Sequence, residues 1–263
     1  MKKLSVVIPS RLGSNPDRTK TSLGFIERAV QSVRAQSVAD RIAIDVLIGV
    51  DAGAEIPPHL ASTLNVSIVE SDGRSQAAAL NAAARKAKGD FIAFLEDDDT
   101  WHPHFLEFAL GCLQHCDFAS STQLEVNEKN DVLRIQDFPT PSGWVMSRST
   151  WEKVGEFNQE YRWCLDNEWL GRLAEQNVRR LHLVEATAPN ALAFLDCRPW
   201  LRNVLTRGGP NIALIRHTEA FPLITRLVHA ASGTGQIASN PEASARHKKE
   251  YAQLEKRFGR IPA

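Results

Sequence analysis

The stretch FIAFLEDDDTW, residues 91–101, runs five apolar residues straight into four consecutive carboxylates. Its apolar half, residues 91–95, shows no polar alternation and predicts a strand buried on both faces, as in a parallel sheet. The four acids, residues 96–99, repel one another unless a positive charge lies among them, and hard divalent cations prefer carboxylate oxygens. Ligands of open α/β sheets bind beyond the carboxyl ends of the strands. The stretch therefore predicts a parallel sheet with a metal site at its edge.

Strand and helix patterns alternate on the N-terminal side of this stretch. Short apolar runs that end in polar loops predict strands at 4–8, 45–50 and 66–69. Apolar residues with a helical period at 22–35, and an alanine-rich run at 73–88, predict helices between the strands. Such alternation predicts an α/β fold, with a mostly parallel sheet, right-handed crossovers and flanking helices.

The second half of the chain is less regular. Strand patterns at 118–125 and 132–138 flank a polar turn and predict a small antiparallel hairpin appended to the sheet. Beyond residue 188 the periodicity weakens, and we expect a helical C-terminal tail. The remaining expected elements are helices at 101–116, 150–154 and 165–176, a strand at 179–184, tail helices at 200–205, 212–217, 221–231 and 243–258, and a flexible link at 233–241.

Length and composition indicate a globular protein with ample core. The chain has 263 residues, of which 43% are hydrophobic and 24% charged, and its formal net charge is zero, so no basic surplus points to nucleic acid. Charge is nevertheless uneven. Residues 198–263 hold 11 Lys and Arg against 4 Asp and Glu, a net of +7, and the remainder carries −7. We therefore expect a basic C-terminal extension on an acidic body.

The cysteines and the N-terminal residues indicate the cellular compartment of the protein. Cys112, Cys116, Cys164 and Cys197 form no C-x-x-C motif, and no second ligand pair has the spacing of a zinc site. The first apolar run ends at Pro9, too early for a signal peptide, and no apolar run approaches the roughly 20 residues of a membrane span. We therefore expect reduced thiols and a cytoplasmic protein.

Five segments lie in the order typical of one enzyme family. They are VVIPS (6–10), GVDAG (49–53), GRSQAAALNAAARKAKGDFIAFLEDDDTWHPHFLE (73–107), GWVMSRSTWEKVGEFNQEY (143–161) and LDNEWLGRLAEQ (165–176). Each is weak alone, but in this order they resemble the family-2 glycosyltransferases over roughly residues 4–185. The resemblance implies the GT-A fold, a Rossmann-like domain at 1–197. Its nucleotide-binding half would be about 1–100 and its acceptor half about 101–197, with 198–263 as the extension.

The resemblance implies a site for a nucleoside-diphosphate sugar in the first half. Its residues would be the loop Pro9, Ser10 and Arg11, then Asp51 as hydrogen-bond acceptor for the base, and Gly73 and Arg74 near the base or diphosphate. Simpler roles stay open. Asp51 can be a turn residue, Gly73 a loop glycine, and Arg74 a solvated residue in a first helical turn.

The same resemblance gives the acids of the acidic stretch different roles. The stretch reads FLDADD in the family and FLEDDD here. It implies that Asp98 binds Mn²⁺ or Mg²⁺, while Glu96, helped by Asp97, reaches the donor ribose. A histidine from the C-terminal region, His217 or His229, is a further candidate ligand. The alternative is a solvated acidic turn whose last acid caps the following helix.

The resemblance also implies a catalytic base. The family motif ED.D aligns with LDNE, so Asp166 would take the proton of the acceptor, with Leu165 in place of the family's first acid. A helix N-terminus keeps such a base ionised, although Asp166 can instead be a simple N-cap. Trp144, Trp163 and Glu168 are candidate acceptor contacts, the tryptophans because flat apolar faces pack on sugars, although core positions are their default.

Together these features predict an inverting, metal-dependent glycosyltransferase of the hexosyltransferase type. A UDP-sugar is the favoured donor, a glycan or lipid-linked sugar the expected acceptor, and polysaccharide biosynthesis the expected setting. The basic extension predicts contact with the inner face of a membrane.

Two other functions stay open. A sugar-nucleotidyltransferase would carry a glycine-rich basic loop after the first strand, where this chain has Arg11, Gly13 and Arg18. A non-catalytic protein that binds nucleotide sugars or glycans is compatible with the departures at Glu96 and Leu165.

Overall fold

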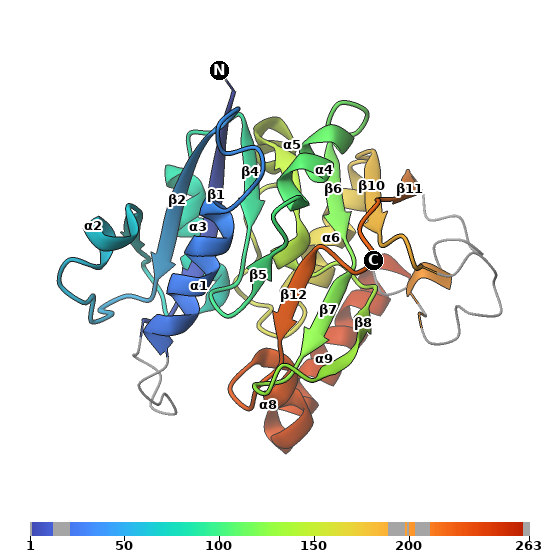
Figure 1. Ribbon diagram of the computed structural model, residues 1–263. Coiled ribbons are helices and arrows are strands. Elements are labelled where there is room, and N and C mark those ends of the chain that lie inside the picture. The colour runs from blue at the N-terminus through green and yellow to red at the C-terminus, as the bar shows by residue number, and fades with distance from the viewer. Residues whose placement is uncertain (1, 13–21, 189–197, 199, 203–210, 260–263) are drawn as a thin grey trace.

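A central, mainly parallel sheet with helices on both faces forms the body of the protein, as the computed structural model shows (Figure 1). The structure describes all residues except 1, 13–21, 189–197, 199, 203–210 and 260–263. In that part of the chain the sheet has the strand order β11-β10-β6-β9-β4-β1-β2-β3, with β9 antiparallel to its neighbours. The strands are β1 (Lys3–Ser10), β2 (Ala43–Val50), β3 (Ser67–Glu70), β4 (Phe91–Phe94), β6 (Phe118–Ser121), β9 (Val145–Ser147), β10 (Arg180–Val184) and β11 (Ile212–Arg216).

The helices pack as two layers on this sheet. One hydrophobic cluster contains side chains of α1 and α4, and the other contains side chains of α3, α5 and α6. Helix α3 packs closely on β2, where a Cβ on Gly49 would lie 2.1 Å from the carbonyl oxygen of Ala79. The helices are α1 (Ser22–Arg34), α2 (Leu60–Leu64), α3 (Gln76–Lys86), α4 (Phe105–Cys112), α5 (Arg148–Val154), α6 (Leu165–Glu175), α8 (Gly233–Ser239) and α9 (Pro241–Phe258), with a short 3-10 turn η1 (Pro141–Gly143).

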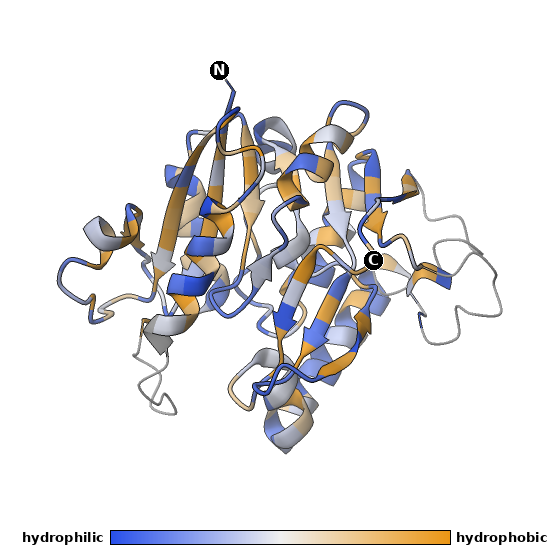
Figure 2. Cartoon of the chain, in the orientation of Figure 1, coloured by the Kyte–Doolittle hydropathy of each residue, from blue (hydrophilic) through white to orange (hydrophobic). Residues whose placement is uncertain are grey.

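Strand β4 and the residue after it are buried on both faces, as the acidic stretch predicts. Ala93 and Leu95 belong to the cluster of α1 and α4, whereas Ile92 and Phe94 belong to the cluster of α3, α5 and α6. None of these four side chains has exposed surface. Figure 2 shows the same concentration of hydrophobic residues along the central strands. The mainly parallel α/β fold predicted from the sequence is therefore confirmed.

A second, smaller sheet lies beside the first and has the order β5-β12-β7-β8 among the described residues. Its strands are β5 (Thr100–Trp101), β7 (Gln123–Val126), β8 (Val132–Gln136) and β12 (Ile224–Leu227). The antiparallel pair β7 and β8 confirms the predicted hairpin. The predicted strand at 118–125 is divided, because β6 belongs to the main sheet and β7 to the smaller one.

Two helices predicted in the C-terminal segment are wrong. Residues 212–217 contain strand β11, which pairs with β10, and residues 221–231 contain strand β12, which pairs with β5 and β7. Short apolar runs fit a helix or a strand equally well, and here open sheet edges determine the outcome. The segment 198–263 is therefore not a separate tail, because its strands complete both sheets.

The remaining C-terminal elements are helical. The expected surface helix is confirmed as α9, whose first turn is capped by the Asn240 side chain. The predicted flexible link contains α8. Of the predicted helix 200–205, residues 200–202 are helical and the rest lie outside the described residues, as does Cys197. In the described part of the chain, every helix is too short or too polar to cross a membrane.

Candidate active site

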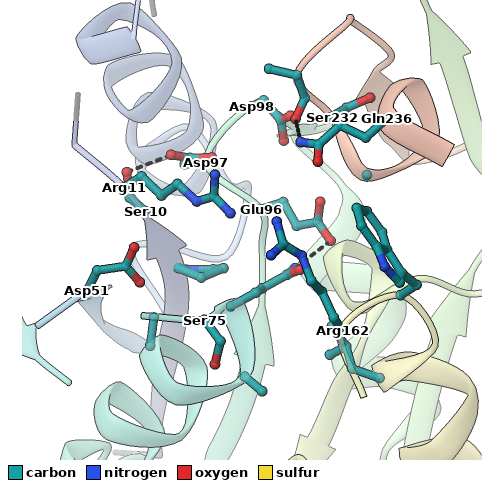
Figure 3. A pocket seen from close by; sticks show the side chains of 18 of the residues that line it. Ser10, Arg11, Asp51, Ser75, Glu96, Asp97, Asp98, Arg162, Ser232 and Gln236 are labelled. Atoms are coloured by element: carbon teal, nitrogen blue, oxygen red, sulfur yellow. Dashed lines mark hydrogen bonds between the residues drawn. The ribbon is translucent and has the colours of Figure 1, made fainter. Parts of the chain in front are cut away.

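A cavity of about 550 Å³ lies at the carboxyl ends of β1, β2 and β4 (Figure 3). Strand β1 contributes its last residues, β2 is followed there by Asp51, and α3 begins at the cavity wall after its N-cap Ser75. The predicted donor and metal residues that line it are Pro9, Ser10, Arg11, Asp51, Arg74, Glu96, Asp97 and Asp98. Parallel strands thus bring residues about 90 positions apart to one edge of the sheet.

Three of the four consecutive acids form a tight group. Carboxylate oxygens of Glu96, Asp98 and Asp99 all lie within 4.8 Å of one another. Burial, followed by the charge of Asp98, raises the pKa of Glu96 to about 7. Burial and the same neighbour raise the pKa of Asp99 well above its ordinary value. Negative charges held this close in a poorly solvated place favour a bound cation.

Each acid has different hydrogen-bond partners. Asp97 accepts a bond from the hydroxyl of Ser10, with 2.5 Å between the oxygens, and so faces the end of β1. Glu96 accepts a bond of 3.1 Å from the side-chain amide of Gln76 on α3. Asp99 is 1% exposed and accepts bonds from the Ser142 hydroxyl and, at 3.0 Å, from the backbone N–H of Leu227 on β12. Asp99 therefore anchors the C-terminal segment to the acidic stretch.

Asp98 faces a histidine from that C-terminal segment. The Nε2 atom of His229 lies 2.9 Å from a carboxylate oxygen of Asp98, and this contact raises the pKa of His229. Of the two candidate histidines, His229 therefore joins the acids and the cavity wall. His217 lies elsewhere, buried against the ring of Phe108 at 5.4 Å between ring centres.

A buried arginine, missed in the sequence, balances part of this negative charge. Arg226 on β12 donates to Glu125 (2.8 Å) and to the hydroxyl of Thr234 (3.0 Å). Burial lowers the pKa of Arg226, but the carboxylates of Glu96, Asp99 and Glu125 outweigh it and hold the pKa above its ordinary value. The sequence offered no signal for this role because residues 221–231 read as a helix.

Asp166 lies in the first turn of α6, beside the cavity that its neighbour Leu165 lines. The charges of Asp166 and Glu96 interact, and burial raises the pKa of Asp166 to about 6 against the opposing backbone N–H of Asn167. The N-cap position of α6 is Cys164, so Asp166 is not a simple N-cap.

The loop before α6 is held by a residue far away in the sequence. Glu250 on α9 accepts hydrogen bonds from three consecutive backbone N–H groups, those of residues 162, 163 and 164, at 3.1, 2.8 and 3.0 Å. This loop carries Arg162 and Trp163 into the cavity wall. The C-terminal segment thus positions both the acidic side of the cavity, through the contact of His229 with Asp98, and the loop that precedes Asp166.

Comparison with known proteins agrees with this geometry. The model of the family described as "Glycosyl transferase family 2" matches residues 5–167, more than half of the chain. The chain belongs to glycosyl transferase family 2. The match contains the cavity residues of β1, β2, α3 and the acidic stretch, and it ends just after Asp166.

Solved structures share the fold of this family 2 glycosyltransferase. The S. aureus TarS 1–349 structure in complex with UDP has a TM-score of 0.56 at 13% identity, over 98% of this chain and 72% of that one. Glucosyl-3-phosphoglycerate synthase from Mycobacterium tuberculosis, in complex with Mn²⁺, UDP and glucosyl-3-phosphoglycerate, has a TM-score of 0.55 at 14% identity, over 98% and 81%. A search of curated protein sequences finds no match. The similarity to the solved structures confirms the GT-A fold.

Besides Asp166, three residues predicted for this family 2 glycosyltransferase's site do not line the cavity. Trp144 has no exposed surface, packs among core aromatic rings and donates to the carbonyl of Pro139, so it does not fit an acceptor contact. Glu168 is 1% exposed and is paired with Arg172 and Arg257, which makes it a structural ion pair. Gly73 acts through its carbonyl, which accepts the backbone N–H of Ala52 and so fixes the loop after β2.

Trp163, in contrast, lines the cavity as expected. Its indole N–H is buried and has no hydrogen-bond partner among the described residues, while the guanidinium of Arg162 lies 5.0 Å from the centre of its ring. Of the three candidate acceptor contacts, Trp163 is the one that a ligand in the cavity can reach.

Proposed function

We propose that this chain is a metal-dependent, inverting glycosyltransferase that moves a sugar from a nucleoside-diphosphate sugar, with UDP as the favoured nucleotide, to an acceptor hydroxyl. The observation that carries the proposal is the contact between Asp98 and His229 beside Glu96, at the strand ends of the cavity. Carboxylate and imidazole together suit Mn²⁺, and carboxylates alone suit Mg²⁺.

The donor side of the cavity supports a nucleotide diphosphate. Asp98 and His229 would hold the cation, with Glu96 close by, and the cation would neutralise charge on the departing diphosphate. Asp51 and the loop Pro9-Ser10-Arg11 also line the cavity, and we place the base and ribose against them. The structures that share this fold were solved with UDP, with UDP-GlcNAc, and with UDP and Mn²⁺.

The acceptor side supports direct displacement. Asp166 takes the proton of the acceptor hydroxyl, whose oxygen attacks the sugar carbon from the face opposite the diphosphate. The bond from that carbon to the diphosphate oxygen breaks, the electron pair leaves with the nucleotide, and the configuration inverts. A pKa of about 6 suits this role, because Asp166 is ionised at neutral pH yet more basic than an ordinary aspartate. Trp163, which lines the cavity, would pack its ring against a sugar.

A thermal-shift panel tests this function. UDP, GDP, ADP and dTDP are compared with and without Mn²⁺, and UDP with Mn²⁺ should give the largest rise in Tm. At 100 times Kd a ligand adds about 2.7 kcal/mol, which corresponds to a shift of about 5–10 °C for a chain of this size. Equal rises in Tm for all four nucleotides, or rises that are the same with and without Mn²⁺, would contradict the proposed donor site. The triphosphates UTP and dTTP are compared in the same way, and larger shifts with them than with the diphosphates would favour a nucleotidyltransferase.

We also propose that the acceptor is a glycan or lipid-linked sugar reached at the cytoplasmic face of a membrane, through exposed lysines of α9 such as Lys248 and Lys249. Each basic residue near an anionic surface contributes about 1 kcal/mol, so the double variant Lys248→Gln, Lys249→Gln should bind anionic vesicles about 30-fold more weakly. Vesicle sedimentation measures this, with neutral vesicles as the control. Equal binding of the wild type to anionic and neutral vesicles would exclude this membrane contact.

A further inference from the structure

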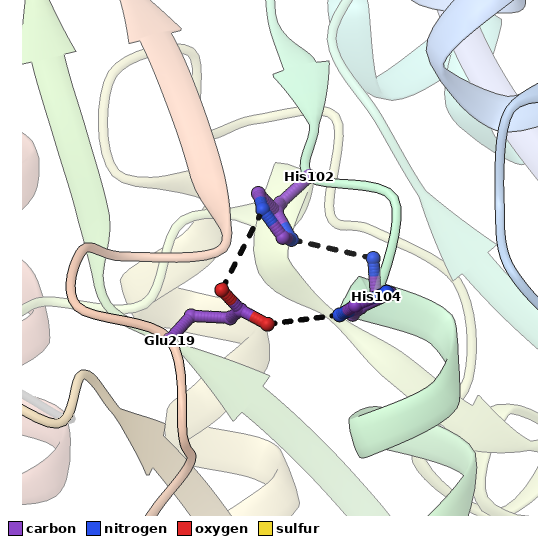
Figure 4. Close-up of side chains that lie close together, drawn as sticks. All are labelled: His102, His104 and Glu219. Atoms are coloured by element: carbon purple, nitrogen blue, oxygen red, sulfur yellow. Dashed lines mark hydrogen bonds and ion pairs between the residues drawn. The ribbon is translucent and has the colours of Figure 1, made fainter.

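A second group of metal-ligating side chains lies outside the cavity (Figure 4). His102 follows β5, His104 stands at the N-terminus of α4, and Glu219 lies in the connection between β11 and β12. One ligand atom from each of the three lies within 4.8 Å of the others. None of the three lines the 550 Å³ cavity, so the group is separate from the proposed donor site.

We propose that His102, His104 and Glu219 bind a divalent transition-metal ion, with Zn²⁺ the best match. Two imidazole nitrogens and one carboxylate oxygen are a common protein ligand set for zinc, with a fourth position left to water. The side chains are 38%, 45% and 31% exposed, so an ion and a water can reach them from solvent. Imidazole-rich sites favour Zn²⁺, Ni²⁺ and Cu²⁺ over Mn²⁺ and Mg²⁺, which distinguishes this group from the acids of the cavity.

The ligand spacing is close to that of a tetrahedral site. Nδ1 of His104 lies 2.8 Å from one oxygen of Glu219, and Nε2 of His102 lies 3.9 Å from the other oxygen. Ligand atoms about 2.0–2.1 Å from a tetrahedral ion lie roughly 3.3 Å apart, between these two distances. The two distances are to different oxygens of Glu219, so the partly exposed side chains would rotate to bring one oxygen to this spacing from both nitrogens. When Nε2 of His102 binds the ion, the ring proton moves to Nδ1. The only hydrogen bond of His102 Nδ1 that is lost is the long one, 3.3 Å, from the backbone N–H of His104.

The ligands are carried by backbone that is already ordered by hydrogen bonds. The N–H of His102 bonds to the carbonyl of Leu223 at 2.8 Å, next to the pairing of β5 with β12. The carbonyl of Glu219 accepts the N–H of Ala186 at 2.8 Å, and its own N–H donates to Nδ1 of His217 at 3.2 Å. The backbone around the ligands is therefore already ordered before the ion binds.

The bound ion would fasten the C-terminal segment to the body of the protein. Glu219 is 115 residues from His104 in the sequence, and strand β12 begins five residues after it. That strand carries Arg226 and leads to His229, the residue that contacts Asp98. We therefore expect Zn²⁺ to raise the Tm of the protein and to act on stability rather than on the sugar transfer.

Zinc titration of the chelator-treated full chain tests the proposal, with calorimetry for affinity and the visible spectrum of Co²⁺ for tetrahedral coordination. His104→Ala and Glu219→Gln should each weaken Zn²⁺ binding at least about 10-fold and abolish the Zn²⁺-induced rise in Tm. His115→Ala, which removes an exposed histidine outside the group, is the matched control and should bind as the wild type does.

Asp98→Asn separates this site from the cavity acids. Zinc binding that survives in Asp98→Asn and is lost in His104→Ala supports the proposal. Binding that is unchanged in both His104→Ala and Glu219→Gln, or that is lost in Asp98→Asn, would overturn it. The Tm of each variant in EDTA shows whether it folds, and Glu219→Gln preserves the shape of the side chain if His104→Ala does not fold. The shift produced by UDP and Mn²⁺ is measured separately, so failure of one site leaves the other testable.

Discussion

Replacing Asp166 by Asn should lower kcat by about 10²- to 10⁴-fold, the usual contribution of a positioned general base. Asparagine keeps the size of the side chain but cannot accept the proton of the attacking hydroxyl. Binding of UDP with Mn²⁺ should stay within about twofold of the wild type, because we place Asp166 on the acceptor side of the cavity. The measurement is UDP release from the donor, with an acceptor or with water in its place.

The pH dependence of the wild type gives an independent readout of the same residue. Burial raises the pKa of Asp166 to about 6, so its base form is lost as the pH falls below about 6, and kcat/KM should then fall about tenfold per pH unit. Asp117→Asn, an exposed aspartate paired with Arg179, is the matched control and should leave the profile unchanged. Full activity in Asp166→Asn would show that another group takes the proton, and loss of UDP binding would move Asp166 to the donor side.

The N-terminal half of the fold could be predicted because each of its elements has a sequence pattern of its own. β1, β2 and β4 are continuous apolar runs, and α3 is an alanine-rich run, so each is recognisable without its neighbours. Their parallel pairing then places Ser10, Asp51 and Asp98 at one edge, as predicted. Strand β1 lies between β2 and β4 in the sheet, so the carboxyl ends of all three strands meet at this edge.

The parts that could not be predicted depend on contacts between distant residues. β11 and β12 form because open edges of β10, β5 and β7 accept them, and nothing within their own four or five residues excludes a helix. The same holds for the site. His229 meets Asp98 across 131 positions, Arg226 meets Glu125 across 101, and Glu250 holds the loop before α6 across 87. A sequence pattern shows residue types at these positions, but the partners appear only once β12 and α9 are in place.

Replacing Asp98 by Asn should change UDP binding in opposite directions with and without metal. With Mn²⁺, the variant loses a carboxylate that holds the ion, so we expect Mn²⁺ binding at least about 10-fold weaker and most of the Mn²⁺-dependent UDP stabilisation gone. Without metal, the same change removes one negative charge from a site that receives a diphosphate. Binding of UDP in EDTA should therefore be equal to or tighter than in the wild type.

The metal-free variant should also be as stable as the wild type or more stable at pH 8. Burial and the charge of Asp98 raise the pKa of Glu96 to about 7 and raise that of Asp99 well above its ordinary value. An acid whose pKa is raised by folding holds its proton more tightly in the folded state. The free energy of unfolding therefore falls as the pH rises from the ordinary carboxyl pKa through the raised one. Removing the charge of Asp98 lowers both pKa values and relieves part of that loss.

Urea unfolding at pH 5 and pH 8, with EDTA or Mn²⁺, checks this second expectation. Asp40→Asn, which changes the same charge on an 81% exposed side chain, is the control and should alter neither stability nor UDP binding. Weaker UDP binding by Asp98→Asn in EDTA would mean that Asp98 contacts the nucleotide directly. Unchanged binding with Mn²⁺ would remove Asp98 from the metal site. The paired signs matter because a merely structural aspartate would weaken binding and stability under both conditions, whereas a metal ligand lowers stability until its ion is present.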